Sequence, residues 1–250
     1  MIERTFDADF FNDICNRPEV RPGLGGTGRI DVSPLVLEPR NIALRTEHGG
    51  FILQPHGAGF YSVHTQFAAE GRGAHAIAAM RAGLDFMFTR TDAMRIFSHC
   101  PDDNSGALAL AKSGGARLWF RNELEPQLGP GQVVAWDIFD WVARTPDLEA
   151  EGEEFHDVSE KAIAANGIEL PDHPHDPIHN RYVGATVRMA RAGQVRKGVL
   201  VYNLWAGAAG YPPADFISES PPTINAGLGM IVQLAPDGEM EVAQCPSVLH

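Results

Sequence analysis

Apolar and polar positions alternate most clearly between residues 41 and 67. Three short runs there are rich in β-branched or aromatic side chains and are separated by glycines and by Pro55, a pattern typical of strands joined by turns. The runs cover residues 41–46, 50–54 and 60–67. We therefore predict a meander of strands in this part of the chain.

Helical spacing of apolar residues begins after the last of these runs. Apolar side chains recur there every three or four positions, which predicts a helix over residues 76–88. They are Ile77, Met80, Leu84 and Met87. A further strand at 94–100 and a helix at 105–112 repeat the order. Strands that alternate with helices indicate an α/β fold with a sheet that is at least partly parallel.

The rest of the chain predicts two further parts. Strands at 116–121 and 132–144 complete a first domain, and residues 149–180 combine a helix with a Pro- and His-rich connector. The remaining residues are expected to form a small, mainly β module, whose predicted strands cover 182–190, 198–205, 228–234 and 239–243. The expected parts are thus residues 1–148, 149–180 and 181–250.

Composition and charge exclude several classes of protein. The chain of 250 residues is 44% hydrophobic and 21% charged, which is ordinary for a globular protein and unlike collagen, a coiled coil or a disordered chain. The net charge of −12 opposes binding to nucleic acid or to anionic lipid. Much of the acidity falls in residues 149–180, and the run at 149–154 is interpreted as the solvated start of a helix.

Targeting and cysteine patterns point to a cytoplasmic protein. The first residues lack the basic and apolar regions of a signal peptide, and no run of about 18 apolar residues occurs. The cysteines are Cys15, Cys100 and Cys245, and they form no Cys-x-x-Cys pair. This spacing indicates neither a disulfide framework nor a zinc ribbon.

A strand that runs into a glycine turn and then a helix is a potential anion site. The first N–H groups of a helix have no intrahelical partner and lie at the positive end of its dipole. Gly71, Gly73 and the small Ala74 would let a pyrophosphate approach the backbone. The spacing fits neither a Rossmann fingerprint nor a P-loop, and a plain tight turn is the alternative interpretation.

Residues 41–121 resemble the GNAT superfamily of acyl-CoA-dependent N-acyltransferases, in particular the GNAT-like proteins of bacteriophages and prophages. The segments that carry the resemblance are Tyr61–Phe67, Glu70–Ala74, Asp85–Thr91, Arg95–Asn104 and Ala107–Arg117. Residues 16–22 and 202–211 also look like the phage members. The resemblance implies a mixed sheet flanked by helices over the first domain.

The resemblance also implies where acyl-CoA would bind. The strand that ends near Phe67 would separate from the strand at 95–100, and pantetheine would insert between them. The residues of this chain expected to bind pantetheine are Thr65, Gln66 and Phe67. Those expected to bind the pyrophosphate are Gly71, Arg72, Gly73 and Ala74. Asn104 would contact the cofactor from the other side, or would instead cap the following helix.

Several positions depart from the family pattern. Glu70 stands where Gln or Arg is usual and would repel a pyrophosphate, and His75 replaces a small residue and would crowd it. Ala111 stands where a Tyr often protonates the CoA thiolate, and Ser62 where phage members often carry Glu.

His64 and Glu70 are the catalytic candidates that remain. His64 is the first of them, because its strand would border the acyl group and a histidine pKa lies close to neutral pH. The alternative for a lone histidine on a strand is a structural role.

Two other groups of residues allow opposite interpretations. Asp172, His173, His175, Asp176 and His179 could hold Zn²⁺ or Ni²⁺, but a solvated linker is the interpretation we favour, and we predict no metal. A second group, of aromatic side chains, could form a surface that binds a partner or could form the core of the last module, and we favour the core. Its members are Tyr202, Trp205, Tyr211 and Phe216.

Two functions of different class follow. The first is an acyl-CoA-dependent N-acyltransferase, phage or prophage encoded, that transfers an acyl group such as acetyl to an amine-bearing substrate. The second is a catalytically inert GNAT-fold protein of a phage particle, whose partners would be other virion or assembly proteins. An oligomer is compatible with either, and the protein would lie in the host cytoplasm or the virion.

Overall fold

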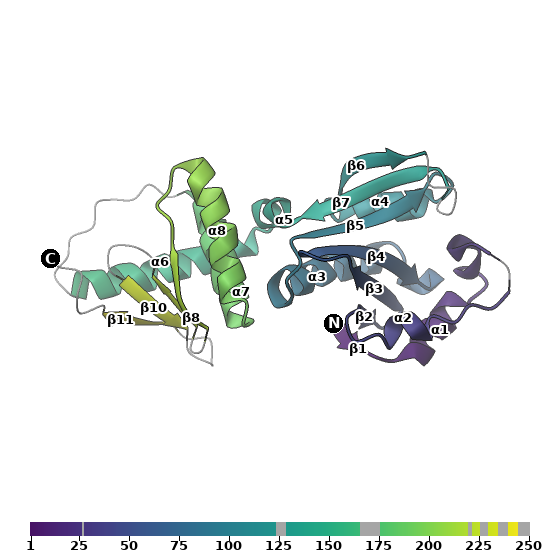
Figure 1. Cartoon of the computed structure of the whole chain (residues 1–250), viewed down its shortest axis with the longest axis horizontal. Helices are drawn as coiled ribbons and strands as arrows, with labels where there is room; N and C mark the ends of the chain where they lie inside the picture. The colour runs from purple at the N-terminus through teal and green to yellow at the C-terminus, as the bar shows by residue number, and fades with distance from the viewer. Residues whose placement is uncertain are drawn as a thin grey trace. The chain divides into compact units, whose positions relative to one another are not determined.

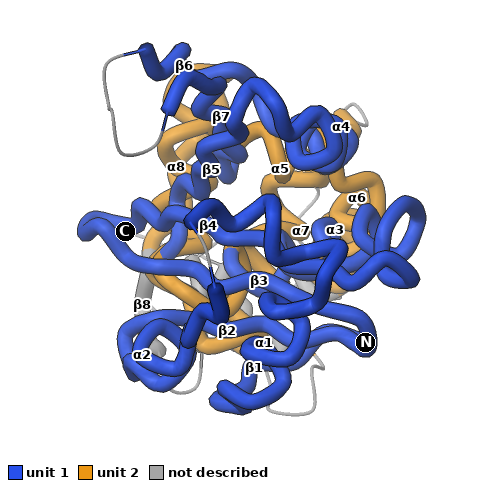
Figure 2. Tube along the Cα trace, turned by 90° about the vertical axis from the view of Figure 1, so that its right-hand side faces the viewer, with its two compact units in different colours: residues 1–87, 93–138 blue, residues 88–92, 139–250 orange. Residues whose placement is uncertain are grey.

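The computed structural model describes residues 1–26, 28–123, 129–165, 176–219, 222–225, 230–234 and 240–244. The chain divides into two compact units, which are described in turn (Figure 2). The first unit comprises Met1–Met87 and Ala93–Ile138, and the second comprises Phe88–Asp92 and Phe139–His250.

A seven-stranded mixed sheet forms the first unit, in the order β1-β2-β3-β4-β5-β7-β6. The strands are β1 (Glu3–Thr5), β2 (Ile42–Thr46), β3 (Gly49–Pro55), β4 (Phe60–Phe67), β5 (Arg95–Pro101), β6 (Arg117–Asn122) and β7 (Gly131–Asp137). Neighbouring strands are antiparallel except β4 and β5, which are parallel. The predicted α/β fold with a mixed sheet is therefore confirmed.

Helices cover both faces of this sheet (Figure 1). They are α1 (Ala8–Cys15), α2 (Ser33–Val36), α3 (Ala74–Arg90) and α4 (Ser105–Ser113), and two short 3-10 helices, η1 (Arg21–Leu24) and η2 (Ala69–Gly71), lie between them in the chain. Phe11 of α1 and Val36 of α2 form a buried cluster with Ile52 of β3. On the opposite face, Met80 of α3 lines a small cavity with Val63 of β4. The alternation along β3 and β4 thus buries apolar side chains under both layers.

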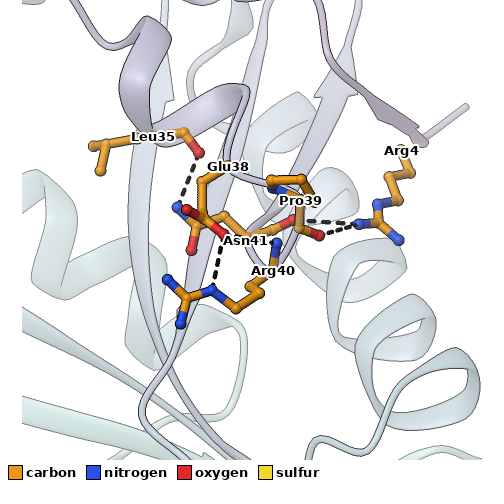
Figure 3. Close-up of polar contacts among 6 residues, drawn as sticks. All are labelled: Arg4, Leu35, Glu38, Pro39, Arg40 and Asn41. Carbon is orange, nitrogen blue, oxygen red and sulfur yellow. Dashed lines mark hydrogen bonds and ion pairs between the residues drawn. The ribbon is translucent and has the colours of Figure 1, made fainter.

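A short loop holds the first strand at the edge of the sheet (Figure 3). Arg4 donates hydrogen bonds to the carbonyl oxygens of Pro39 (3.1 Å) and Asn41 (3.3 Å). Asn41 Nδ2 in turn donates to the carbonyl of Leu35 at 2.9 Å, and Arg40 pairs with Glu38 at 2.8 Å. The loop between α2 and β2 is therefore tied both to α2 and to β1.

The second unit combines helices with a small antiparallel sheet. The helices are α5 (Ile138–Arg144), α6 (Asp147–Ala165), α7 (Pro177–Arg191) and α8 (Val195–Ala209). The strands are β8 (Asp215–Glu219), β9 (Pro222–Asn225), β10 (Met230–Leu234) and β11 (Met240–Gln244), in the order β11-β10-β9-β8. The strands predicted at 228–234 and 239–243 correspond to β10 and β11 within the described residues.

The strands predicted at 182–190 and 198–205 are wrong, because these residues belong to α7 and α8. Nearly every residue of α7 between Tyr182 and Ala190 is buried, so apolar side chains occur on all sides of the helix and hide its 3.6-residue period. Asp176, which caps the helix, and Pro177 at its first position are the local signals of its start.

The predicted strand at 132–144 is correct only in its first half. Residues 131–137 form β7, whereas Ile138–Arg144 form α5. Phe139 and the residues after it belong to the second unit, so the first compact unit ends at Ile138, before the boundary expected at residue 148.

Ion pairs engage the acidic run at 149–154, which corrects its interpretation as a solvated helix start. Glu149 pairs with Arg181 at 3.1 Å, Glu151 pairs with Arg188, and Glu154 pairs with Arg191 at 3.9 Å. Each pair joins α6 to α7. The negative charge of this segment is therefore matched by the basic residues of the next helix.

Candidate functional site

Strands β4 and β5 separate partway along their length. Their parallel pairing includes Phe60 with Arg95, Tyr61 with Ile96 and Ser62 with Phe97. Beyond these pairs β4 continues to Phe67 and β5 to Pro101, but the two strands no longer pair with each other. Each remains paired with its other neighbour, β3 or β7. The predicted separation of these two strands is therefore confirmed, and we call the space between their ends the strand opening.

The register of β3 and β4 determines which backbone groups point into the strand opening. The N–H of Ala68 donates to the carbonyl of His48 at 3.0 Å, and hydrogen-bonded pairs alternate along an antiparallel ladder. His64 and Gln66 therefore direct their backbone groups to β3, opposite Ile52 and Gly50.

Thr65 and Phe67 consequently direct their N–H and C=O groups away from β3, towards the strand opening. This arrangement supports two of the three residues expected to bond pantetheine. The N–H and C=O groups of Gln66 point the opposite way from those of Thr65 and Phe67, so they face β3 and not the strand opening.

The turn after β4 is shaped by two glycines. Gly71 lies so close to the β2–β3 hairpin that a Cβ atom at this position would be 2.6 Å from Cβ of His48. Gly73 has φ +66° and its carbonyl accepts the first helical hydrogen bond, from Ile77 at 3.1 Å. A Cβ atom on Gly73 would meet no atom within 4 Å. Gly73 and Ala74 are exposed, so the start of α3 is accessible to an anion, as an anion site requires.

Arg17 offsets the charge of Glu70 at this turn. Arg17 donates to Glu70 Oε1 at 2.6 Å, and Arg72 donates to the carbonyl of Glu19 at 2.7 Å. The backbone N–H of Glu70 itself, followed by Arg17, lowers the pKa of the Glu70 carboxyl. Glu70 is thus an ionised, paired carboxylate, and the repulsion expected from it is counterbalanced by a guanidinium in contact with it.

His75 is held against the sheet. Its Nε2 lies 3.2 Å from Oγ1 of the buried Thr46, and its ring centroid lies 5.1 Å from that of His48 and 6.0 Å from that of Phe67. The imidazole that was expected to crowd the turn is therefore engaged by the β2–β3 hairpin and the end of β4.

Asn104 caps a helix. Its Oδ1 accepts a hydrogen bond from the N–H of Ala107 at 3.0 Å, at the start of α4. The capping role considered for this residue is confirmed. Ala111, where a Tyr acid is usual, is only 3% exposed and carries no proton donor.

His64 lies on the face of β4 opposite α3. Its Nε2 is 3.0 Å from Gln54 Oε1, an oxygen that can only accept, so Nε2 carries the proton and Nδ1 keeps its lone pair. Although the residue as a whole is exposed, protein atoms around the ring desolvate it, and this effect, followed by the charge of His56, lowers the pKa of His64. His64 is therefore neutral at neutral pH and able to take a proton.

Gln66 adds a buried polar group to the same face. It is 4% exposed, and its Oε1 has no hydrogen-bond partner in the described part of the chain. An unsatisfied buried acceptor costs about 1–3 kcal/mol, so Gln66 would gain from a ligand that donates to it. The expectation from the resemblance concerned the backbone of Gln66, whereas the unpartnered polar atom in the structure belongs to its side chain.

Sequence reasoning missed two residues that surround His64. Gln54 orients its ring, and His56 Nε2 lies 2.9 Å from Ser62 Oγ. Gln54 lies opposite Ser62 in the β3–β4 ladder. The strands predicted at 50–54 and 60–67 could have revealed this, because pairing them as a hairpin places Gln54 beside Ser62.

The described part of the His- and Asp-rich segment has a structural role. Asp176 caps α7 and accepts a hydrogen bond from Tyr211 at 2.5 Å. The ring of His179 stacks on Tyr211 with centroids 4.3 Å apart. Within the described ranges no group of three or more metal-ligand side chains is arranged to hold an ion, and Asp172, His173 and His175 lie outside those ranges.

The aromatic group near residue 205 packs together as expected for a core. Trp205 stacks on Tyr182 with centroids 4.4 Å apart and lies 5.2 Å from Tyr211. Tyr202 is 8% exposed. The side chain of Phe216 lies outside the described set.

In the described helices no segment is long and apolar enough to cross a membrane.

Solved structures similar to this chain are acetyltransferases. Aminoglycoside acetyltransferase AAC(6')-Ib in complex with coenzyme A and kanamycin is 13% identical, with a TM-score of 0.48 over 58% of this chain and 98% of that chain. A spermidine N-acetyltransferase SpeG variant from Vibrio cholerae is 12% identical, with a TM-score of 0.47 over 58% and 98%. A GNAT-family acetyltransferase from Bacillus anthracis is 16% identical, with a TM-score of 0.44 over 55% and 93%.

These likenesses concern the fold, and they carry no conclusion about activity at these identities and TM-scores. No family model and no curated protein matches the sequence. The functional argument therefore depends on the geometry of the strand opening and the turn that follows it.

Proposed function

We propose that the first unit is a GNAT-type N-acyltransferase that uses acyl-CoA. The observation that carries this proposal is the strand opening between β4 and β5, which ends at the glycine turn before α3. A sheet normally pairs the backbone groups of its inner strands, so unpaired groups at Thr65 and Phe67 need another partner. An extended ligand whose amide groups are followed by a pyrophosphate would satisfy both the strand and the helix.

The residues of this chain fit such a ligand. Thr65 and Phe67 would bond the amides of pantetheine, and the backbone from Gly71 to Ala74, with Arg72, would hold the pyrophosphate. When bound, acyl-CoA supplies a thioester whose acyl carbon an amine can attack. Arg17 keeps Glu70 paired and so limits its repulsion of phosphate.

His64 would act on the acceptor amine. Its Nδ1 takes a proton from the amine as the nitrogen attacks, while Nε2 stays bonded to Gln54. Backbone N–H groups on the separated part of β4 would stabilise the negative charge that develops on the acyl oxygen. The tetrahedral intermediate would then collapse with cleavage of its C–S bond, and the CoA thiolate that leaves would take a proton from solvent while His64 returns the amine proton to solvent. No covalent enzyme intermediate is required. Glu70 is less suited as a base, because its low pKa makes it a weak proton acceptor.

A calorimetric titration with acetyl-CoA tests the proposal. Saturable binding is expected for the wild type and a large loss for Gly73→Val, whose side chain would cover the N–H groups of α3. Gly193→Val is the matched control, since Gly193 also has a positive φ, +80°, and a Cβ atom on it would likewise meet nothing within 4 Å. Both variants carry similar backbone strain, about 1–2 kcal/mol. Absence of binding by the wild type, or equal effects of the two variants, would contradict the proposal.

The second candidate is an inert GNAT-fold protein of a phage particle. The observation that favours it is the buried Ala111, which leaves α4 without a proton donor for the thiolate at this position. This candidate predicts that no amine releases thiol from acetyl-CoA. Release of thiol with any amine, lost in His64→Gln, would exclude it.

A further inference from the structure

Three aromatic side chains form a surface on the His64 side of the sheet. Trp119 of β6 has its ring centroid 6.4 Å from that of Phe60 on β4 and 5.8 Å from that of Phe97 on β5. Trp119 is 43% exposed. We call Phe60, Phe97 and Trp119 the aromatic face. In Figure 1, α1 and α2 lie beside β1 and β2, away from β6 and β7.

The aromatic face is continuous with His64. The ring of His56 lies 5.3 Å from that of Phe97, and His56 Nε2 lies 2.9 Å from Ser62 Oγ. Ser62 and His64 are two positions apart on β4, so their side chains lie on the same face of the sheet. An amine that gives its proton to His64 would therefore have the aromatic face beside the rest of the molecule.

Among the described residues, the four strands that carry this surface offer no acidic side chain that lacks an ion-pair partner for a second amino group. Strands β4, β5, β6 and β7 contain one acidic residue, Asp137. Arg95 binds that carboxylate through Nη2 at 2.6 Å and Nε at 3.1 Å, and its guanidinium also lies over Trp119 at 5.3 Å. A ligand with several ammonium groups would therefore contact aromatic rings, histidines and an arginine on this surface. Its further ammonium groups would find no counter-charge on these strands, although the chain as a whole carries a charge of −12.

We infer that the acceptor is a monoamine with an aromatic body, not a polyamine or an aminoglycoside. This inference rests on the proposed acyl transfer. The rings would stack with the body of such an amine, as aromatic pairs do with centroids about 4.5–7 Å apart. The lack of available carboxylates on the four strands would disfavour a polycation, because each further ammonium would lose water without gaining a counter-charge.

Thiol release from saturating acetyl-CoA tests the inference with full-length protein. The panel contains phenethylamine and tryptamine against spermidine and kanamycin. We expect kcat/KM for the aromatic monoamines to be about tenfold higher or more, a difference equivalent to about 1.4 kcal/mol.

Two variants on one strand locate the effect. Trp119→Ala should raise KM for tryptamine several-fold and leave kcat nearly unchanged, because it removes binding of the body and not of the reacting amine. Leu118→Ala is the matched control, since Leu118 is 61% exposed and lies opposite Val134, on the other face of the sheet. Its KM and kcat should equal those of the wild type.

The outcomes separate the inference from the proposed function. Equal or better use of spermidine, equal effects of the two variants, or acetyl-CoA binding without turnover of either aromatic amine would overturn the inference. The first two of these outcomes would leave acyl transfer intact. Failure of acetyl-CoA to bind in the calorimeter would overturn the proposed function, and the inference with it.

Discussion

His64 and Glu70 show how neighbouring groups decide the chemistry of a single residue. Both were catalytic candidates because both can accept a proton. Its own backbone N–H, followed by contact with Arg17, keeps Glu70 ionised and weakly basic, whereas desolvation keeps His64 neutral. The residue types alone do not distinguish these states, because they depend on the local backbone of Glu70, on its partner Arg17 and on the atoms packed around His64.

Replacement of His64 by Gln should lower kcat/KM by about 10²–10⁴-fold, the usual contribution of a general base. In the wild type, kcat/KM should rise as pH increases through the pKa of His64, which lies below the ordinary value of 6.5. The base form is present above that pKa and lost below it. His64→Gln should lack this acidic limb in a pH profile of thiol release.

Glu70→Gln is the control for this prediction. It removes the competing carboxylate and leaves the imidazole, so the acidic limb should persist. Loss of the limb in Glu70→Gln, with its retention in His64→Gln, would assign the base to Glu70 instead.

Lys197 should make stability depend on pH. Its Nζ donates to the carbonyls of Phe88 (2.7 Å) and Thr91 (2.8 Å) at the end of α3, and burial lowers its pKa from 10.5 to about 7. Between these values the unfolded chain binds more protons than the folded one, so the contribution of Lys197 to the free energy of unfolding increases as pH rises. This contribution is fully present above pH 10.5 and is lost as the pH falls through about 7.

Urea unfolding of the wild type and Lys197→Met at pH 7 and pH 9 measures this effect. The wild type should gain stability relative to the variant at the higher pH. A difference between the two proteins that does not change with pH would refute the assigned pKa shift.

Among the elements, α6 and α7 approach so closely that only glycine fits between them. A Cβ atom on Gly184 would lie 1.9 Å from the carbonyl oxygen of Leu148, and one on Gly152 would lie 2.0 Å from that of Asn180. Real side chains do not tolerate such distances. The crossing of these helices therefore depends on both glycines, and the ion pairs of the acidic run lie at the same interface.

Gly184→Ala should reduce the free energy of unfolding by about 1–3 kcal/mol, the usual cost of overpacking. Gly207→Ala on α8 is the control, because a Cβ atom there would meet nothing within 4 Å. It should be neutral or stabilise by up to about 1 kcal/mol, since Ala has the higher helix propensity. Equal destabilisation of both variants in urea would show that the close contact does not determine the effect.

In the whole molecule, the proposed ligand site belongs to the first compact unit alone. Thr65, Phe67, Gly73 and His64 all lie in it, whereas α7 and α8 belong to the second. Acetyl-CoA should therefore slow amide hydrogen exchange in residues 65–77 and leave α7 and α8 unchanged, because bound ligand suppresses local opening where it contacts the chain. Protection confined to the second unit would contradict the assignment of the site.

Prediction from the sequence succeeded where turn residues bounded each element and failed for the buried helices of the second unit. The strands of the meander were identified from their β-branched and aromatic residues and from the glycines and proline between them, although β2 and β3 are buried on both faces. The helix at 76–88 was identified from apolar residues that recur every three or four positions. The period of α7 was lost because residues such as Val183 and Ala185 are buried on opposite sides of one helix. The resemblance predicted that β4 separates from β5, but only the observed register showed that Gln66 pairs with β3 and that Thr65 does not.

The sequence by itself determined the alternation of strands and helices in the first unit and the glycine turn before α3, because strand period, helix period and positive φ depend on adjacent residues. The tertiary structure decided which residues meet: Arg17 with Glu70, Gln54 with His64, and Phe97 with Trp119. These pairs set the charge of Glu70, the tautomer of His64 and the aromatic face. Each depends on the path of the chain between the two partners, and the order of residues specifies that path only through the packing of the entire fold.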